Sequence, residues 1–141
     1  MDMQQLQQSD TAPGEQAGTH SANAAAGITR LHVGATLSDT AICNGTVYLA
    51  GQVADDLTRN IDGQTREVLA HIDRLLAEAG TDKSRILMCQ VFLADIKDFD
   101  GMNHVWQGWV APGNAPPRAT VEAKLARPQL LVEMVVTASA Q

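Results

Sequence analysis

The segment NAPPRATVE at residues 114–122, followed by LLVEMVV at residues 130–136, decides how the C-terminal part of this chain folds. The two prolines disfavour helix before Arg118, so Arg118 opens a β-strand, and the second segment is an apolar strand interrupted by Glu133. A guanidinium offers a planar fork of donors that matches a carboxylate, and a buried Glu costs free energy unless it is paired or used. The pair therefore predicts either a site for a small acid or a structural ion pair.

Alternation along the first strand sends four side chains to one of its faces: Arg118, Thr120, Glu122 and Lys124. If the chain turns back at residues 126–129, the second strand lies antiparallel beside the first. We therefore expect Glu133 to lie within reach of a ligand that Arg118 holds.

Upstream of these strands, the pattern predicts a meander of three strands that opens the domain. Residues 28–33 alternate apolar and polar side chains, and two further strands, 40–43 and 46–50, flank Asn44-Gly45. Asn-Gly between apolar runs indicates a tight hairpin, because both central residues must accept positive φ.

The apolar residues change from alternation to helical spacing, and this predicts two helices. Apolar residues recur on one face of residues 61–79, with polar residues such as Gln64 mostly elsewhere, and Gly80 supplies the stop. A second helix begins behind an Asp98 cap and ends before Pro112-Gly113.

The remaining strands are predicted at residues 85–94, 117–125 and 129–138. The order βββαβαββ indicates an α+β domain, a single six-stranded mixed sheet with two helices on one face. In the last strand both alternating sets are apolar apart from Glu133, which predicts that the uncovered sheet face is an oligomer interface.

Composition limits the domain and its partners. Residues 1–27 carry almost no large apolar side chains, so we expect a flexible tail before one domain at 28–141. The net charge of −6, with scattered basic residues, argues against nucleic-acid binding. No apolar run is long enough to span a bilayer and no signal-peptide pattern is present, which predicts a soluble, cytoplasmic protein without a membrane partner.

Other chemistries find little support in the motifs. Cys43 and Cys89 are far apart in apolar runs and are interpreted as buried thiols. The histidines show no paired-ligand spacing, Asp55 and Asp56 read as solvated charges, and no dinucleotide or nucleotide glycine motif occurs. We expect neither a metal nor a cofactor.

Four stretches, taken together, resemble the RidA/YjgF family of enamine/imine deaminases. They are residues 47–52, ending in Gly-Gln; residues 86–95; residues 98–103; and residues 115–122 followed by Val132-Glu133-Met134. The resemblance covers about residues 28–140. Tryptophans in the second helix and the short connection at 111–114 are similar to one subgroup of that family.

The resemblance implies a chorismate-mutase-like fold and a homotrimer with active sites in the clefts between subunits. It implies cofactor-independent hydrolysis of a C=N bond, in which 2-imino acids such as 2-iminobutanoate or 2-iminopropanoate become 2-oxo acids and ammonia. Arg118 would bind the substrate carboxylate, and Glu133 would position or deprotonate the attacking water. Gly51, Thr120 and Asn103 would complete the substrate contacts, although a polar helix residue explains Asn103 equally well.

The chain departs from the family at one position. The aromatic residue that many deaminating members carry after the first strand is replaced by about Leu37. The loss of the hydroxyl of that residue bears on substrate preference and efficiency more than on anion binding. Because the resemblance also includes members without a clear activity, the second hypothesis is a non-catalytic trimeric module that binds small carboxylates or another protein. A pericyclic enzyme of the same fold is the third alternative, and fold similarity alone is a poor argument for it.

Overall fold

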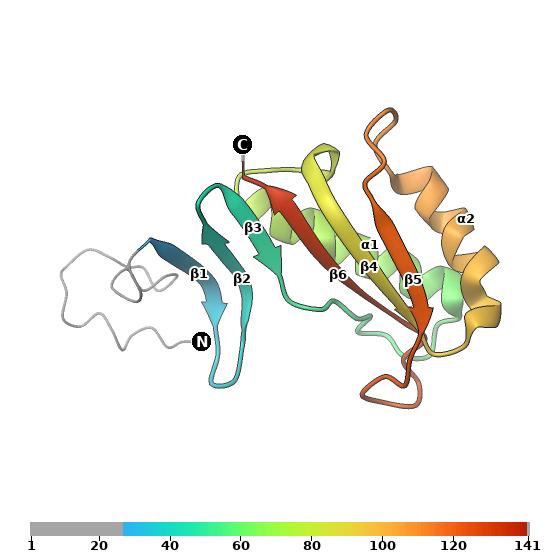
Figure 1. Cartoon of the computed structure of the whole chain (residues 1–141). Helices are drawn as coiled ribbons and strands as arrows, with labels where there is room; N and C mark the ends of the chain where they lie inside the picture. Colours follow the sequence, from blue (N-terminus) through green and yellow to red (C-terminus); the bar gives the residue numbers. More distant parts are fainter. Residues whose placement is uncertain (1–26, 141) are drawn as a thin grey trace.

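The structure is a computed structural model that describes residues 27–140, so the predicted tail lies outside the described residues except for Gly27. Six strands form one sheet in the order β1-β2-β3-β6-β4-β5 (Figure 1). The strands are β1 (Ile28–Val33), β2 (Ser38–Cys43), β3 (Thr46–Leu49), β4 (Ile86–Leu93), β5 (Arg118–Glu122) and β6 (Val132–Ser139). The helices are α1 (Ile61–Glu78) and α2 (Phe99–Trp109), each preceded by a short 3-10 turn or loop. The predicted order βββαβαββ is confirmed.

Local sequence signals set several element boundaries as predicted. Asn44 and Gly45 have φ of 51° and 77°, the two positive values that a tight β2–β3 hairpin requires. The Asn60 side chain accepts a hydrogen bond from the Gly63 N–H at 3.0 Å and begins α1, and Gly80, at φ 83°, follows its end. Asp98 makes no capping hydrogen bond, because the 3-10 turn η3 (Ile96–Asp98) leads directly into α2.

α1 packs across one face of the sheet and lies behind it in Figure 1, and α2 packs against α1 and stands beside β5, with its buried residues in the same core. The core lies between them and the alternate strand residues that face them, including Val91 and Met134, which are fully buried. Gln64, expected on the polar side of α1, is also fully buried. Its amide donates to the Arg59 and Gln129 carbonyls and accepts from the Leu131 N–H, so it ties α1 to the chain before β6.

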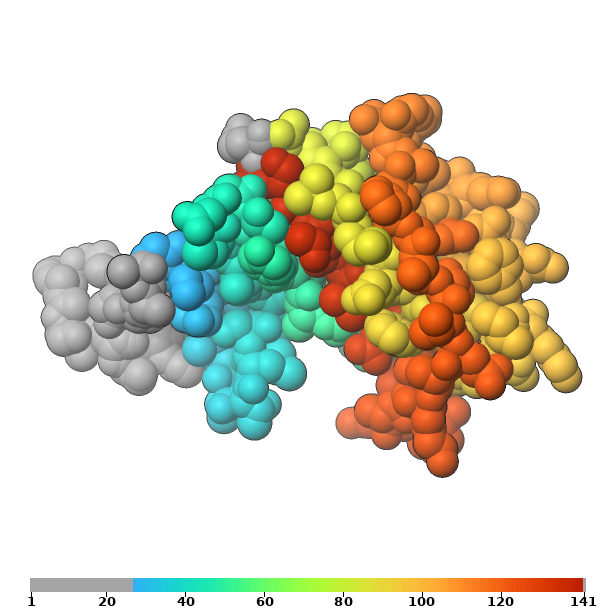
Figure 2. All heavy atoms as spheres, in the orientation of Figure 1, coloured from blue at the N-terminus to red at the C-terminus, as the bar shows by residue number. Residues whose placement is uncertain are grey.

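The opposite sheet face has no helix over it. On this open face Tyr48, Met88 and Val121 are 50%, 40% and 48% exposed. In Figure 2 the side chains of β3, β6, β4 and β5 are visible side by side with neither helix in front of them. β6 buries every second residue on the helix side and leaves the others half-buried, as its double apolar pattern predicted.

The expected pairing of the last two strands is wrong. β5 pairs with β4 in parallel, and β6 pairs with β4 on its other side, so β4 separates the two segments. The physical reason is α2: a parallel pair needs a crossover, and the helix between β4 and β5 supplies it. β5 is therefore an edge strand, at the opposite edge from β1.

Candidate functional site

Arg118 begins β5 and turns its guanidinium toward α2. The guanidinium carbon lies 5.0 Å from the centre of the Trp106 ring and 5.6 Å from that of Phe99. The two rings are two helical turns apart on α2, so they share the face of the helix that meets the sheet edge. Contacts of this kind favour a desolvated cation and hold its orientation.

One nitrogen of this guanidinium is buried without a partner. Arg118 Nη1 is inaccessible to solvent and has no hydrogen-bond partner among the described residues, and the same holds for Thr120 Oγ1. The two residues are in register with Cys89 and Val91 on the helix-covered face, about 7 Å apart along the strand. An unpaired buried charged donor is costly, so this pair of groups suits a ligand that supplies acceptors.

Asn103 lies on α2 between the two rings, four residues after Phe99 and three before Trp106. Helical spacing therefore places it on the same side of α2 as the surroundings of Arg118, where it is half-buried. We call Arg118, Thr120 and Asn103 the arginine half-site.

Glu133 lies on the open face, packed against Gly51. A Cβ atom at position 51 would overlap Oε2 of Glu133 and lie 3.0 Å from its Cδ, so this close approach needs glycine. The neighbouring residues Gln52 and Met134 exchange two backbone hydrogen bonds, of 2.8 and 3.1 Å, which hold the two segments together. We call Gly51 and Glu133 the glutamate half-site.

The two half-sites do not meet within one chain. Arg118 is in register with Cys89 on the helix-covered face, whereas Glu133 is in register with Phe92, and through it with Val121, on the open face. The sequence reasoning put Arg118 and Glu133 on adjacent strands with a shared ligand. The strand order corrects this, because β4 intervenes and the side chains point to opposite sides of the sheet.

Leu37, where the resemblance expects an aromatic ring, lies in the turn between β1 and β2 and is 60% exposed. This turn is at the edge of the sheet opposite to β5 (Figure 1). Within one chain, Leu37 therefore belongs to neither half-site.

Cysteine chemistry is not available beside Arg118. Burial raises the pKa of the Cys89 thiol to about 12, and the opposing effect of the Arg118 charge is smaller. Cys89 is thus a neutral thiol at physiological pH and a poor nucleophile. Cys43 and Cys89 are both free thiols, as predicted, but only Cys89 is buried; Cys43, at the end of β2 beside the hairpin turn, is partly exposed, so the expectation of two buried thiols is wrong for Cys43.

The sequence reasoning missed a second polar cluster, formed by Asp55, Glu67 and His71. Glu67 and His71 are four residues apart on α1, a spacing visible in the sequence that places two side chains on one helix face. Asp55 joins them from the loop before the helix, which no spacing rule indicates.

No helix within residues 27–140 has the length and apolar character needed to cross a bilayer.

The fold and these groups define a class of protein, the chorismate-mutase-like α+β domains of the YjgF type. The crystal structure of a YjgF family member from Neisseria meningitidis is 41% identical, with a TM-score of 0.79 over 81% of this chain and 95% of that one. A Rid family protein from Yersinia pestis is 31% identical, with a TM-score of 0.71 over 76% and 90% of the two chains.

The sequence comparisons give the same result. The model of the family described as "Endoribonuclease L-PSP" matches residues 27–140. A RutC family protein of Haemophilus ducreyi is 52% identical over 112 residues, which cover 79% of this chain and 96% of that protein. The chain belongs to this family, whose members are named RutC, YjgF or Rid proteins, and the resemblance inferred from the sequence is confirmed.

Proposed function

We propose that the protein is a cofactor-independent deaminase that hydrolyses small 2-imino acids to 2-oxo acids and ammonia. The observation that carries the proposal is the unpaired Nη1 of Arg118, a buried cationic donor beside the free hydroxyl of Thr120. Two aromatic rings hold the guanidinium in place before any ligand arrives. A small carboxylate matches this arrangement in charge and in hydrogen-bonding geometry.

In the proposed reaction, Arg118 binds the carboxylate of the 2-imino acid and so fixes the position of its C=N carbon. Glu133 orients a water molecule and takes up one of its protons as the oxygen adds to that carbon, and the imine nitrogen takes a proton from solvent, which gives a carbinolamine. Glu133 returns its proton to the amino group, which leaves as ammonia, while the hydroxyl gives its proton to solvent and becomes the carbonyl of the 2-oxo acid. Positioning and general base catalysis of this kind need no cofactor.

The proposal requires more than one chain, because Arg118 and Glu133 face opposite sides of the sheet. We propose a homotrimer in which the arginine half-site of one subunit meets the glutamate half-site of its neighbour. Two features support this assembly: Arg118 lies on an edge strand, and the open face carries exposed apolar side chains such as Tyr48 and Val121. Such a head-to-tail contact closes into a ring of three when each subunit is rotated by one third of a turn from its neighbour.

A non-catalytic module that binds small carboxylates is the second candidate. It is favoured by the completeness of the arginine half-site, which offers donors and aromatic walls without any contribution from Glu133. The description of the family model names an endoribonuclease, which makes RNA a further class of ligand to weigh. The net charge of −6 opposes it, because RNA binding relies on a cationic surface.

Rates of imine hydrolysis distinguish the deaminase from the binding module. They are measured for wild type, Arg118→Met and Glu133→Gln. 2-Aminoacrylate or 2-iminobutanoate is generated in situ, and release of the 2-oxo acid is followed against the uncatalysed rate. We expect kcat/KM to fall about 10²-fold in each variant, because one loses a charged hydrogen bond to substrate and the other its general base. The control is Arg127→Ala, which removes an exposed cation from the turn before β6. We expect this variant to keep the activity of wild type.

Binding is measured separately by titration with a 2-oxo acid. Tryptophan fluorescence is the readout, since the Arg118 guanidinium lies over the Trp106 ring. If the protein is a deaminase, Arg118→Met loses binding of the 2-oxo acid and Glu133→Gln keeps it. If wild type binds the acid but hydrolyses no imine above background, the module replaces the enzyme; if it does neither, both functions are wrong.

A further inference from the structure

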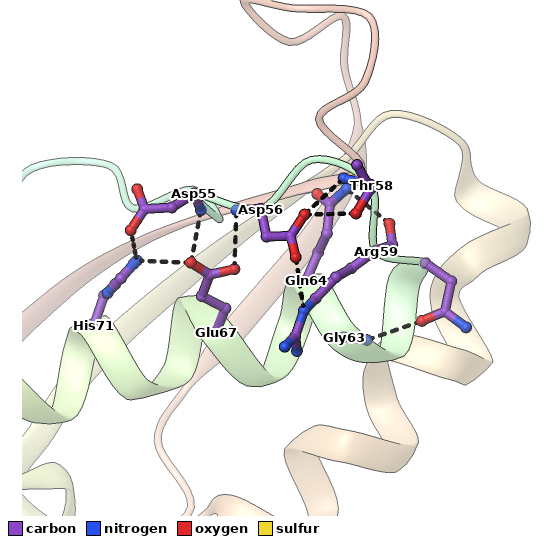
Figure 3. Close-up of polar contacts among 9 residues, drawn as sticks. Asp55, Asp56, Thr58, Arg59, Gly63, Gln64, Glu67 and His71 are labelled. Atoms are coloured by element: carbon purple, nitrogen blue, oxygen red, sulfur yellow. Dashed lines mark hydrogen bonds and ion pairs between the residues drawn. The ribbon is translucent and has the colours of Figure 1, made fainter.

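Three side chains with metal-binding atoms converge where the loop after β3 runs along α1 (Figure 3). Glu67 and His71 are one turn apart on α1 and present their polar atoms to the loop. Asp55, from the loop, faces them. We call these three residues the His71 cluster; its ligand atoms all lie within 4.8 Å of one another.

Two of the three distances between these atoms are close to the distance between neighbouring ligands of a small cation. His71 Nε2 lies 3.2 Å from Asp55 Oδ2 and 3.7 Å from Glu67 Oε2. Donors bound to a tetrahedral zinc ion at about 2.0–2.2 Å are separated from each other by about 3.4 Å. The distance of 3.7 Å is too long for a hydrogen bond, so a proton on Nε2 can join His71 to Asp55 but not to Glu67.

The carboxylate of Glu67 is fixed before any cation binds. Its Oε2 accepts the Asp55 N–H at 2.9 Å, and its Oε1 accepts the Asp56 N–H at 3.2 Å. These two bonds hold the carboxylate in one orientation, with both oxygens turned toward the loop. Each oxygen retains a lone pair, and outer hydrogen bonds of this type orient the ligands of metal sites.

The three donors differ in how exposed they are. The side chains of Glu67 and His71 are 20% and 18% exposed, whereas that of Asp55 is 82% exposed. Two donors are thus held in place on the helix and the third is free to adjust to an ion. The remaining coordination positions face solvent.

We propose that Asp55, Glu67 and His71 bind one divalent transition-metal cation per chain, with Zn²⁺ as the best match. One imidazole and two carboxylates suit zinc and its neighbours, whereas Ca²⁺ and Mg²⁺ prefer all-oxygen sites with more ligands. The ion would fasten the loop that leads away from Gly51 to the helix. This site is separate from both half-sites.

Arg74 gives the proposal a specific signature. Its Nη2 lies 3.4 Å from Nδ1 of His71, and a guanidinium only donates, so this contact requires Nδ1 without a proton. A metal on Nε2 requires the opposite tautomer, with the proton on Nδ1. Arg74 therefore competes with the ion and must turn away when it binds, which its exposed position on α1 allows.

The test is calorimetric titration of the metal-free, full-length protein with Zn²⁺. We expect one zinc ion per chain in wild type, and affinity at least tenfold weaker in His71→Ala and in Glu67→Gln. His104→Ala removes an exposed histidine of α2 and leaves binding unchanged. Circular dichroism of each variant verifies the fold, and Co²⁺ in place of Zn²⁺ gives a visible spectrum that reports the ligand set.

Two arginine substitutions on α1 test whether Arg74 competes with the ion. Arg74→Ala should tighten zinc binding several-fold, whereas Arg66→Ala, which removes the same charge from the same helix but from an ion pair with Asp62, should leave it unchanged. The proposal is overturned if wild type shows no saturable zinc binding, if His71→Ala binds zinc as wild type does, or if Mg²⁺ competes equally. The cluster would then be an ion-paired fastening of loop to helix.

Discussion

The two half-sites differ in how the fold makes them. The arginine half-site depends on a crossover: β5 reaches the sheet edge only after α2, and α2 then supplies the rings around Arg118. The glutamate half-site depends on one local strand contact, the two-bond bridge between Gln52 and Met134. One half-site faces the helices and the other faces away from them.

Each half-site therefore lacks a group that the other has. Among residues 27–140, the arginine half-site has buried donors without an acceptor, and the carboxylate of the glutamate half-site, on the open apolar face, has no ion-pair partner. Free energy favours bringing such groups together with a ligand between them, since a buried donor without a partner is expensive. A neighbouring subunit is the simplest way to do so.

Trimers that mix Arg118→Met and Glu133→Gln subunits should give the largest change in hydrolysis rate. Arg118→Met leaves the glutamate half-site intact, and Glu133→Gln leaves the arginine half-site intact, so co-assembled subunits would rebuild some complete sites. With random mixing in a closed ring, about one quarter of the sites combine two intact halves. We expect the imine hydrolysis rate of the mixture to recover to about that fraction of wild type, from two nearly inactive parents.

The control is a mixture of either variant with itself, treated identically. Sedimentation must first show that the subunits associate, and differently tagged chains must show that they exchange. Recovery in proportion to the mixed species supports half-sites from different subunits. A mixture that associates and exchanges but stays inactive contradicts that assembly.

Gly51→Ala should weaken the glutamate half-site alone. The added Cβ would overlap Oε2 of Glu133 and force the carboxylate away from its position. Displacing a catalytic group by a fraction of an ångström costs about tenfold or more in kcat, while acid binding at Arg118 persists. The rate of 2-oxo acid release measures kcat, and the fluorescence titration measures acid binding.

Gly108→Ala is the matched control for this glycine. A Cβ at Gly108 on α2 meets nothing within 4 Å, so this substitution should leave kcat unchanged and stabilise the helix by about 0.5–1 kcal/mol. Equal kcat for wild type and Gly51→Ala would mean that the packing of Glu133 on Gly51 has no catalytic role.

Much of the fold follows from the sequence because its signals are local. The Asn44-Gly45 turn and the apolar stripe of α1 each specify an element without reference to the rest of the chain. The order of these elements then indicated a single mixed sheet with two helices on one face, and the resemblance implied the chorismate-mutase-like fold. Gln64 was misplaced because its three hydrogen bonds are to backbone groups far along the chain or in the preceding loop, and no helical pattern encodes them.

The candidate site was predicted by residue type and only partly by position. That Arg118 and Thr120 share a strand face follows from alternation and is seen in the register of β4 and β5. The relation of Arg118 to Glu133 was wrong because it assumed that consecutive strands pair. Strand order is a long-range property, fixed here by the crossover helix and not by the turn at residues 126–129.

Thr120→Val should give the smallest effect, and it tests whether the unpaired hydroxyl serves a ligand. In the described chain Thr120 Oγ1 has no partner, so an isosteric methyl should not lower the free energy of unfolding and fits a strand well. Loss of one neutral hydrogen bond should weaken 2-oxo acid binding by about 2–10-fold. Denaturant unfolding and the fluorescence titration give the two numbers.

Thr40→Val separates a ligand effect from a packing effect. Thr40 also carries a buried hydroxyl without a partner, but it lies on β2, in register with Leu49 and three strands away from β4. Both substitutions should therefore act alike on stability, and only Thr120→Val should change acid binding. If the two variants bind the acid as wild type does, the hydroxyl of Thr120 takes no part in the arginine half-site, and Arg118 must hold the carboxylate without it.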